Sequence, residues 1–150
     1  MLRRNNVVRS VEITSRDLKL SWRNIWFYCA IFIIVVATYP WTDFRGYAHW
    51  DRIIWVPFQS MRHSLDGLAN IALYVPFGFS YVQSRLHVRK GGVIKAAILA
   101  ALLSVSCEFY QVFCNSRFPS MSDVISNTVG GVIGALIAGK LHVSRVIIDK

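Results

Sequence analysis

Several residue patterns that identify common classes of soluble protein are missing from this chain of 150 residues. It has three cysteines, an odd number without a CxxC pair, so neither a disulfide framework nor a zinc site is expected. Its four histidines are scattered, and none stands at metal-ligand spacing from another ligand. A glycine-rich phosphate loop and a nucleophile elbow are also missing. We therefore expect no metal and no cofactor.

Acidic residues are scarce, with 8 Asp and Glu against 17 Lys and Arg, which gives a net charge of +9. In a soluble protein, a charge of this size would suggest nucleic acid as a partner. Here the basic residues gather between apolar stretches, and they form no basic stripe with interleaved aromatic residues. Attraction to anionic lipid headgroups explains them better. The sequence predicts membrane lipids as partners and no nucleic acid.

Apolar residues make up 54% of the chain, more than a soluble protein of this length usually has. A membrane-spanning helix needs roughly 20 mostly apolar residues. Four such stretches lie at about 24–39, 66–81, 93–113 and 121–141. They predict an all-α fold, a polytopic membrane four-helix bundle. The connection 42–65 is aromatic but too charged to span, so we expect one interfacial segment in this first outer loop.

The distribution of Lys and Arg predicts the orientation of the bundle. Thirteen of the 17 basic residues lie in the N-terminal segment, the second connection and the tail, and four lie in the first and third connections: Arg45, Arg52, Arg62 and Arg117. Because cytoplasmic segments carry the excess of Lys and Arg, both termini are predicted to be cytoplasmic. The predicted organisation is a basic cytoplasmic segment at 1–23, a four-span membrane domain at 24–141 and a cytoplasmic tail at 142–150.

Seven polar residues fall at one predicted membrane depth, near the outer ends of the second, third and fourth spans. They are Asp66, Asn70, Glu108, Gln111, Arg117, Asp123 and Asn127. Spacings of three and four residues place each pair on a common helical face. Ionisable groups inside a membrane are costly and usually face a bundle interior or an aqueous cavity. We therefore predict that these residues meet in a ligand-binding site at the outer mouth of the bundle.

Structural roles remain open for some of these residues. Asp123 follows a serine at capping-box spacing, and Asp66 could serve the start of the second span. Glu108 could pair with Arg117 as a structural bridge. Capping does not account for Glu108 or Gln111, since both lie in the last turns of the third span, where the helix dipole and desolvation disfavour a carboxylate. Glu108 is therefore the strongest pointer to function.

Small residues and a proline predict how the helices pack. Gly130-x-x-x-Gly134 is a pattern that lets another helix approach closely. Pro76 lies inside the second span, and Gly78 follows it. Proline removes a backbone hydrogen bond and kinks a helix. We expect these four residues to shape the packing of the bundle.

The polar and glycine positions together resemble the VanZ-like family over about residues 60–140. The resemblance rests on Asp66-x-x-x-Asn70, Pro76-x-Gly78, Glu108-x-x-Gln111, Arg117, Asp123-x-x-x-Asn127 and Gly130-x-x-x-Gly134. It implies a small multi-pass protein of the bacterial inner membrane with a role in the cell envelope. The founding member of the family is associated with resistance to the glycopeptide antibiotic teicoplanin, and relatives occur near exopolysaccharide functions. The resemblance supplies no reaction.

Three functions are compatible with the sequence. The first is a non-catalytic envelope protein that binds a lipid-linked glycan, a lipid or a glycopeptide-type ligand and lowers antibiotic susceptibility. The second is a membrane-embedded enzyme acting on a lipid-linked substrate, with Glu108 or Asp123 as general acid or base and Arg117 holding an anion. The third is a structural subunit that assembles with other envelope proteins. Neither the ligand nor the oligomeric state follows from the sequence.

Overall fold

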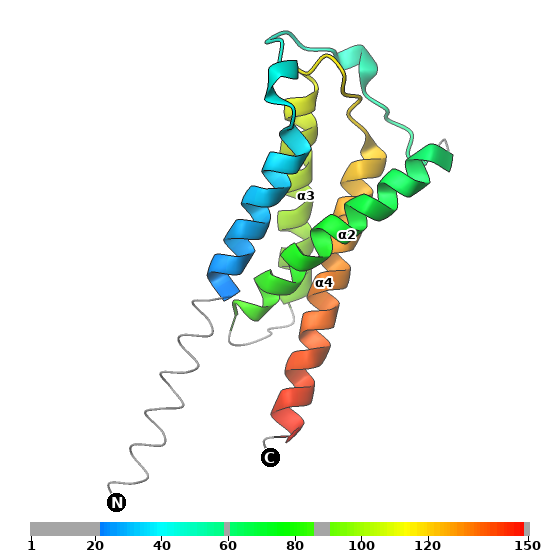
Figure 1. Ribbon diagram of the computed structural model, residues 1–150. Helices are drawn as coiled ribbons and strands as arrows, with labels where there is room; N and C mark the ends of the chain where they lie inside the picture. The colour runs from blue at the N-terminus through cyan, green and yellow to red at the C-terminus, as the bar shows by residue number, and fades with distance from the viewer. Residues whose placement is uncertain (1–21, 59–60, 86–90, 149–150) are drawn as a thin grey trace, which may run out of the picture.

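The computed structural model describes residues 22–58, 61–85 and 91–148, and the part of the chain that it describes is helical, with no β-strand. The helices are Trp22–Thr38, α2 (Met61–Gln83), α3 (Gly92–Gln111) and α4 (Met121–Ile148). They run alternately in opposite directions and form a bundle, which α2 crosses obliquely (Figure 1). The predicted all-α four-helix bundle is confirmed. Most of the predicted segment 1–23, the end of the predicted tail and the side chains of 61–65 and 142–148 lie outside the described residues.

The helices begin and end where local chemistry requires it. The first helix ends at Thr38, two residues before Pro40, because proline cannot continue the helical hydrogen bonds. α3 follows a pair of glycines and ends at Gln111. α2 begins at Met61, five residues earlier than predicted. Consequently Asp66 lies inside α2, and the alternative that it serves the start of that helix does not hold.

α2 and α4 pack at unusually close range. A Cβ atom on Gly134 would lie 2.0 Å from the carbonyl oxygen of Val75, and one on Gly78 would lie 2.0 Å from that of Gly131. A Cβ on Gly130 would meet the carbonyl oxygen of Ile71 at 2.4 Å. No side chain fits at these positions unless a backbone moves.

Pro76 has a different place in α2. It is exposed, whereas Gly78, two residues later, is buried against α4. The hydroxyl of Ser80, one turn later, donates to the carbonyl oxygen of Pro76 at 2.6 Å. The predicted packing residues therefore divide into glycines at the α2–α4 contact and a proline outside it.

The apolar core fills the half of the bundle nearer the chain termini. Ile33, Tyr74, Phe77 and Ala100 form one buried cluster, and Trp26 packs against it. The Trp26 ring lies with its centroid 5.8 Å from that of Phe77. This core leaves the opposite end of the bundle to polar side chains.

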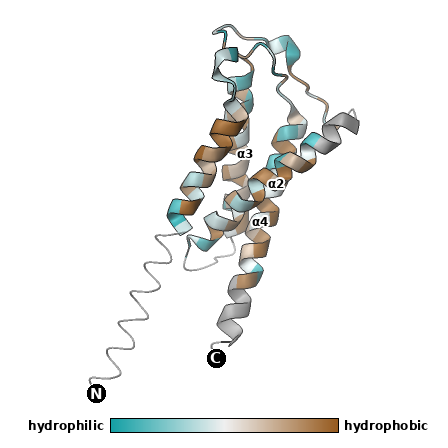
Figure 2. Cartoon of the chain, viewed as in Figure 1, coloured by the Kyte–Doolittle hydropathy of each residue, from teal (hydrophilic) through white to brown (hydrophobic). Residues whose placement is uncertain are grey.

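Large apolar side chains are exposed along three of the four helices. They include Ile31 and Phe32 on the first helix; Ile94, Ile98 and Leu102 on α3; and Val129, Ile133 and Leu136 on α4. Figure 2 shows hydrophobic residues along these helices. Soluble monomers rarely expose contiguous apolar patches of more than a few hundred Å². This exposed surface is typical of helices that face lipid.

Two of the described helices, α3 and residues Met121–Leu141 of α4, are long and apolar enough to cross a membrane. Helix Trp22–Thr38 is apolar but shorter, spanning about 25 Å at 1.5 Å per residue. α2 has the length, but it carries polar residues in its first half, among them Asp66 and Asn70. Four spans and the orientation of the termini therefore remain predictions.

The two connections at one end of the bundle pair with each other. The first contains two short 3₁₀ helices, η1 (Trp41–Asp43) and η2 (Trp50–Arg52). Its backbone N–H groups at Arg45 and Ile54 donate to the carbonyl oxygens of Phe113 and Pro119, at 2.9 and 2.8 Å. The connections thus close this end of the bundle (Figure 1). Exposed Trp41, Phe44, Tyr47, Trp50 and Trp55 suit the predicted interfacial position.

Candidate functional site

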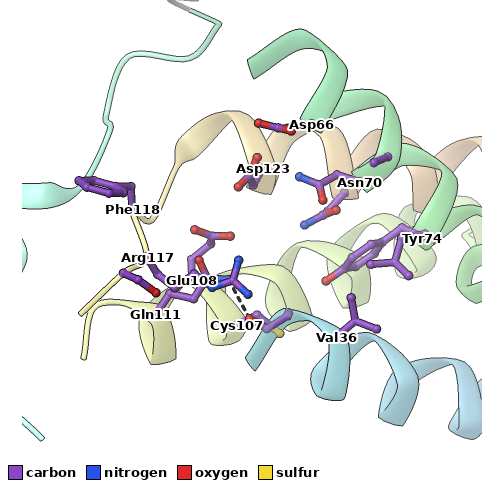
Figure 3. Close-up of a pocket in the computed structure, with 15 residues that line it drawn as sticks. Val36, Asp66, Asn70, Tyr74, Cys107, Glu108, Gln111, Arg117, Phe118 and Asp123 are labelled. Atoms are coloured by element: carbon purple, nitrogen blue, oxygen red, sulfur yellow. Dashed lines mark hydrogen bonds between the residues drawn. The ribbon is translucent and has the colours of Figure 1, made fainter. Parts of the chain in front are cut away.

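A cavity of about 440 Å³ lies at the end of the bundle that the two connections close (Figure 3). All seven polar residues singled out in the sequence line it: Asp66, Asn70, Glu108, Gln111, Arg117, Asp123 and Asn127. They come from α2, the last turn of α3, the α3–α4 connection and the start of α4. Val36, Ala37 and Leu73 add an apolar wall. Polar side chains up to 61 positions apart in the sequence, from Asp66 to Asn127, therefore share one cavity.

Glu108 joins α3 to the start of α4. Its Oε2 accepts a hydrogen bond from the backbone N–H of Ser120 at 2.8 Å, and its side chain is only 9% exposed. Ser120 Oγ in turn accepts from the N–H of Ser122 at 3.1 Å, as an N-cap side chain does.

In a capping box, an acid three residues into the helix accepts the N–H of the N-cap residue. Here the acid that accepts this N–H comes from a different helix, α3. The expectation that capping does not account for Glu108 is therefore wrong. The sequence could not show this, because the carboxylate caps a neighbouring helix and not its own.

Arg117 and Gln111 bind the end of the first helix. The guanidinium of Arg117 donates to the carbonyl oxygen of Tyr39, and Gln111 Nε2 donates to that of Ala37 at 3.0 Å. The last carbonyl groups of a helix have no partner within the helix. Gln111 therefore satisfies one of them, that of Ala37, and Arg117 satisfies the carbonyl of Tyr39 just past the helix end. Between the described residues Glu108 and Arg117 the structure holds no salt bridge, and the bridge considered from the sequence is not present.

The two aspartates lie toward the opening of the cavity. Asp66 is exposed, and Asp123 is partly exposed in the first turn of α4. A carboxylate in a first turn is favoured by the positive end of the helix dipole, so Asp123 stabilises α4 as well as lining the cavity. Figure 3 shows both carboxyl groups beside the same opening.

The floor of the cavity is polar but uncharged. Asn127 Nδ2 donates to Ser104 Oγ at 2.8 Å, whereas its Oδ1 has no hydrogen-bond partner although it is buried. The hydroxyl of Tyr74, a residue only 1% exposed, also has no partner. Tyr74 was missed in the sequence, although it follows Asn70 by four residues and so shares its helical face.

No three His, Cys, Asp or Glu side chains gather closely enough to hold a metal ion in the part of the chain that the structure describes. Cys29, Cys107 and Cys114 are free thiols. Burial raises the pKa of the Cys114 thiol, so this group is held in its neutral form. The cavity therefore presents carboxylates, amides, hydroxyls and one guanidinium to a ligand.

Comparison with known families identifies the fold. The family model described as VanZ/LLP1 matches residues 25–142, which include every residue that lines the cavity. The chain belongs to the VanZ/LLP1 family. This confirms the resemblance drawn from the polar and glycine positions, and it extends the match to the first helix. No curated protein and no solved structure matches the chain.

Membership of VanZ/LLP1 agrees with the surface of the bundle. The family is one of membrane proteins, and this chain exposes apolar side chains along three helices, two of which can cross a membrane. The VanZ/LLP1 chain is thus a membrane protein whose bundle is apolar outside and polar at one end of its interior.

Proposed function

We propose that this VanZ/LLP1 protein is a cell-envelope protein of the bacterial inner membrane that binds the polar head of an amphiphile in the cavity. The amphiphile would be a lipid, a lipid-linked glycan or a glycopeptide. The observation that carries the proposal is the convergence of seven polar side chains on one cavity, at one end of a bundle that is otherwise apolar.

The size and lining of the cavity support binding of a headgroup. Sites for small molecules usually measure about 300–1,000 Å³ and combine apolar walls with a few polar groups. This cavity measures about 440 Å³ and has both kinds of wall. The apolar residues Val36 and Leu73 suit a chain attached to the head.

Binding is favoured over catalysis by the contacts of the candidate catalytic groups. One carboxylate oxygen of Glu108 accepts the N–H of Ser120, and the guanidinium of Arg117 donates to Tyr39. Both side chains therefore hold the walls of the cavity together. A general acid or base would need to reach a reacting atom instead.

The cavity would face the outer leaflet. The excess of Lys and Arg in the N-terminal segment, second connection and tail supports cytoplasmic termini. In Figure 1 the described ends nearest the termini lie opposite the two paired connections. With this orientation, the ligand would be a component of, or an antibiotic in, the outer half of the bilayer.

The test is ligand binding by the full chain, purified in detergent and measured by native mass spectrometry with an undecaprenyl-linked disaccharide as probe. Asp66→Ala removes a carboxylate from the cavity and should weaken binding by about tenfold, the effect of about 1.4 kcal/mol. Asp51→Asn, in exposed η2, is the matched control and should bind like the parent chain. The proposal would be overturned if the parent chain and both variants bound the probe equally tightly, or if the parent chain did not bind it.

The proposed link to antibiotic susceptibility needs a separate measurement. Expression in a teicoplanin-sensitive host should raise the antibiotic concentration that stops growth, and Asp66→Ala at equal membrane abundance should abolish the increase. Unchanged susceptibility, together with preserved binding, would reject the antibiotic role and leave headgroup binding in place.

A further inference from the structure

Two polar groups at the floor of the cavity are buried without partners. The Tyr74 hydroxyl and Asn127 Oδ1 make no hydrogen bond, although their residues are only 1% and 7% exposed. Buried polar groups are nearly always paired in folded proteins, because an unpaired one keeps the cost of leaving water. Both residues, Tyr74 and Asn127, line the cavity.

Both side chains lie next to Ser104. Asn127 Nδ2 donates to Ser104 Oγ at 2.8 Å. The Tyr74 hydroxyl lies close to the Ser104 side chain and interacts with it, but the contact lacks the distance and angle of a regular hydrogen bond. In Figure 3 the Tyr74 side chain points its oxygen into the cavity. Both groups therefore belong to the part of the cavity beside Ser104.

The chemistry of the pair selects the kind of group. Asn127 Oδ1 needs a donor, whereas the Tyr74 O–H needs an acceptor. An ammonium group only donates, a phosphate only accepts, and an aliphatic hydroxyl does both. A phosphate would also lie in the same cavity as the carboxylate of Glu108. A hydroxyl satisfies both protein groups at once.

We propose that the floor of the cavity binds a hydroxyl of a neutral head, such as a sugar attached to a lipid, through Tyr74 and Asn127. The inference rests on the proposed headgroup-binding function and specifies its ligand class. The apolar wall formed by Val36, Ala37 and Leu73 indicates a head attached to a chain and not a free sugar.

The experiment compares probes that share dioleoyl chains and differ in their heads: monoglucosyl-dioleoylglycerol, dioleoylphosphatidylethanolamine and dioleoylphosphatidate. Binding to the full chain is measured by native mass spectrometry in an amine-oxide detergent, which carries no hydroxyl to compete. Methyl glucoside serves as the free sugar. We expect the glucosyl lipid to bind at least about tenfold more tightly than the other two lipids and methyl glucoside not to bind.

Tyr74→Phe removes only the hydroxyl oxygen and should weaken binding of the glucosyl lipid about five- to tenfold, as expected for one hydrogen bond. Binding of the other two lipids should not change. Tyr81→Phe is the matched control, since Tyr81 is buried in the core outside the cavity and its hydroxyl accepts from Arg85 at 3.5 Å. It should leave all binding unchanged.

The outcomes separate this inference from the proposed function. If all three lipids bind equally, or Tyr74→Phe binds the glucosyl lipid like the parent chain, the hydroxyl preference is rejected and headgroup binding stands. If no lipid binds to the parent chain, both fail. If Tyr74→Phe melts at a lower temperature than the parent chain when no lipid is present, the hydroxyl already has a partner without ligand, for example a water molecule. That result would also reject the inference.

Discussion

Glu108 is a carboxylate in the last turns of an apolar helix, where its charge would be costly. The structure shows what offsets that cost, because Oε2 accepts the backbone N–H of Ser120 at the start of α4. The same contact fixes the distance between α3 and α4 at the cavity. A structural contact and a place in the cavity wall are therefore combined in one side chain.

Two replacements of Glu108 should distinguish the stabilising effect of its hydrogen bond to Ser120 from the effect of its negative charge. Glu108→Ala leaves the Ser120 N–H buried without an acceptor, which should cost about 1–3 kcal/mol of stability. Glu108→Gln retains a carbonyl oxygen that can accept this N–H, so it should melt close to the parent chain. Thermal unfolding of the purified variants in detergent measures both effects.

Ser106→Ala is a suitable control for Glu108. Ser106 lies in the same helix, is exposed and donates within α3 to the carbonyl oxygen of Leu102. Its replacement should leave the melting temperature nearly unchanged. If Glu108→Gln unfolds as readily as Glu108→Ala, the negative charge matters and not the hydrogen bond. If Glu108→Ala melts like the parent chain, the contact with Ser120 is not stabilising.

Asp43 offers a test based on pH. Hydrogen bonds from the hydroxyl and the N–H of Ser116 to Oδ2, at 2.6 and 2.8 Å, lower the pKa of Asp43 below its ordinary value of 3.8. The stabilisation is therefore present above the ordinary pKa and is lost as the pH falls through the lowered one. The difference in melting temperature between the parent chain and Asp43→Asn should disappear over this acidic range. A difference in melting temperature that stayed constant across this pH range would contradict the prediction.

At the scale of helices, the contact between α2 and α4 determines the shape of the bundle. α2 is the least apolar of the helices by composition, yet it makes the closest backbone approach, through Gly78, Gly130 and Gly134. Tight packing of small residues is a main source of helix association in membranes, where the hydrophobic effect between helices is weak. α2 is thus held by its fit to α4.

Gly134→Ala should destabilise the bundle, because the added methyl group would lie 2.0 Å from the carbonyl oxygen of Val75. Overpacking of this kind costs about 1–3 kcal/mol. Gly139→Ala is the matched control in the same helix, since a Cβ there meets nothing within 4 Å. It should be neutral or slightly stabilising, as alanine is the better helix former. Equal melting temperatures in detergent would show that the helices are not in this contact.

The fold class and the seven polar residues of the cavity could be predicted from the sequence, because both depend on local patterns. The long apolar stretches predicted the helices, and spacings of three and four residues predicted which polar residues share a helical face. The start of α2 was wrong because Arg62 and His63 were assigned to a polar connection, whereas polar residues can also lie in the first turns of a helix. The capping contact of Glu108 depends on how α3 meets α4, which local spacing does not contain.

At the scale of the whole molecule, orientation remains a prediction from charge. Reporter fusions after Lys90 and at the C-terminus should report the cytoplasm, and a fusion after Ser60 should report the outside. The reason is the excess of Lys and Arg in the segments assigned to the cytoplasm. Paired fusions to alkaline phosphatase and green fluorescent protein measure on which side of the membrane each position lies. A cytoplasmic signal at Ser60 would place the cavity in the inner leaflet.

The close contact between α2 and α4 also has a consequence for synthesis in the cell. α2 leaves the ribosome before α4, but the surface that Gly78 of α2 fits belongs to α4. Until α4 is inserted, α2 must hold its polar face without its partner, and the cavity lacks one wall. Chains truncated after Cys114 should therefore be removed by membrane proteases, while α4 supplied as a separate polypeptide should rescue them. The cavity is therefore complete only after α4 has been synthesised and inserted.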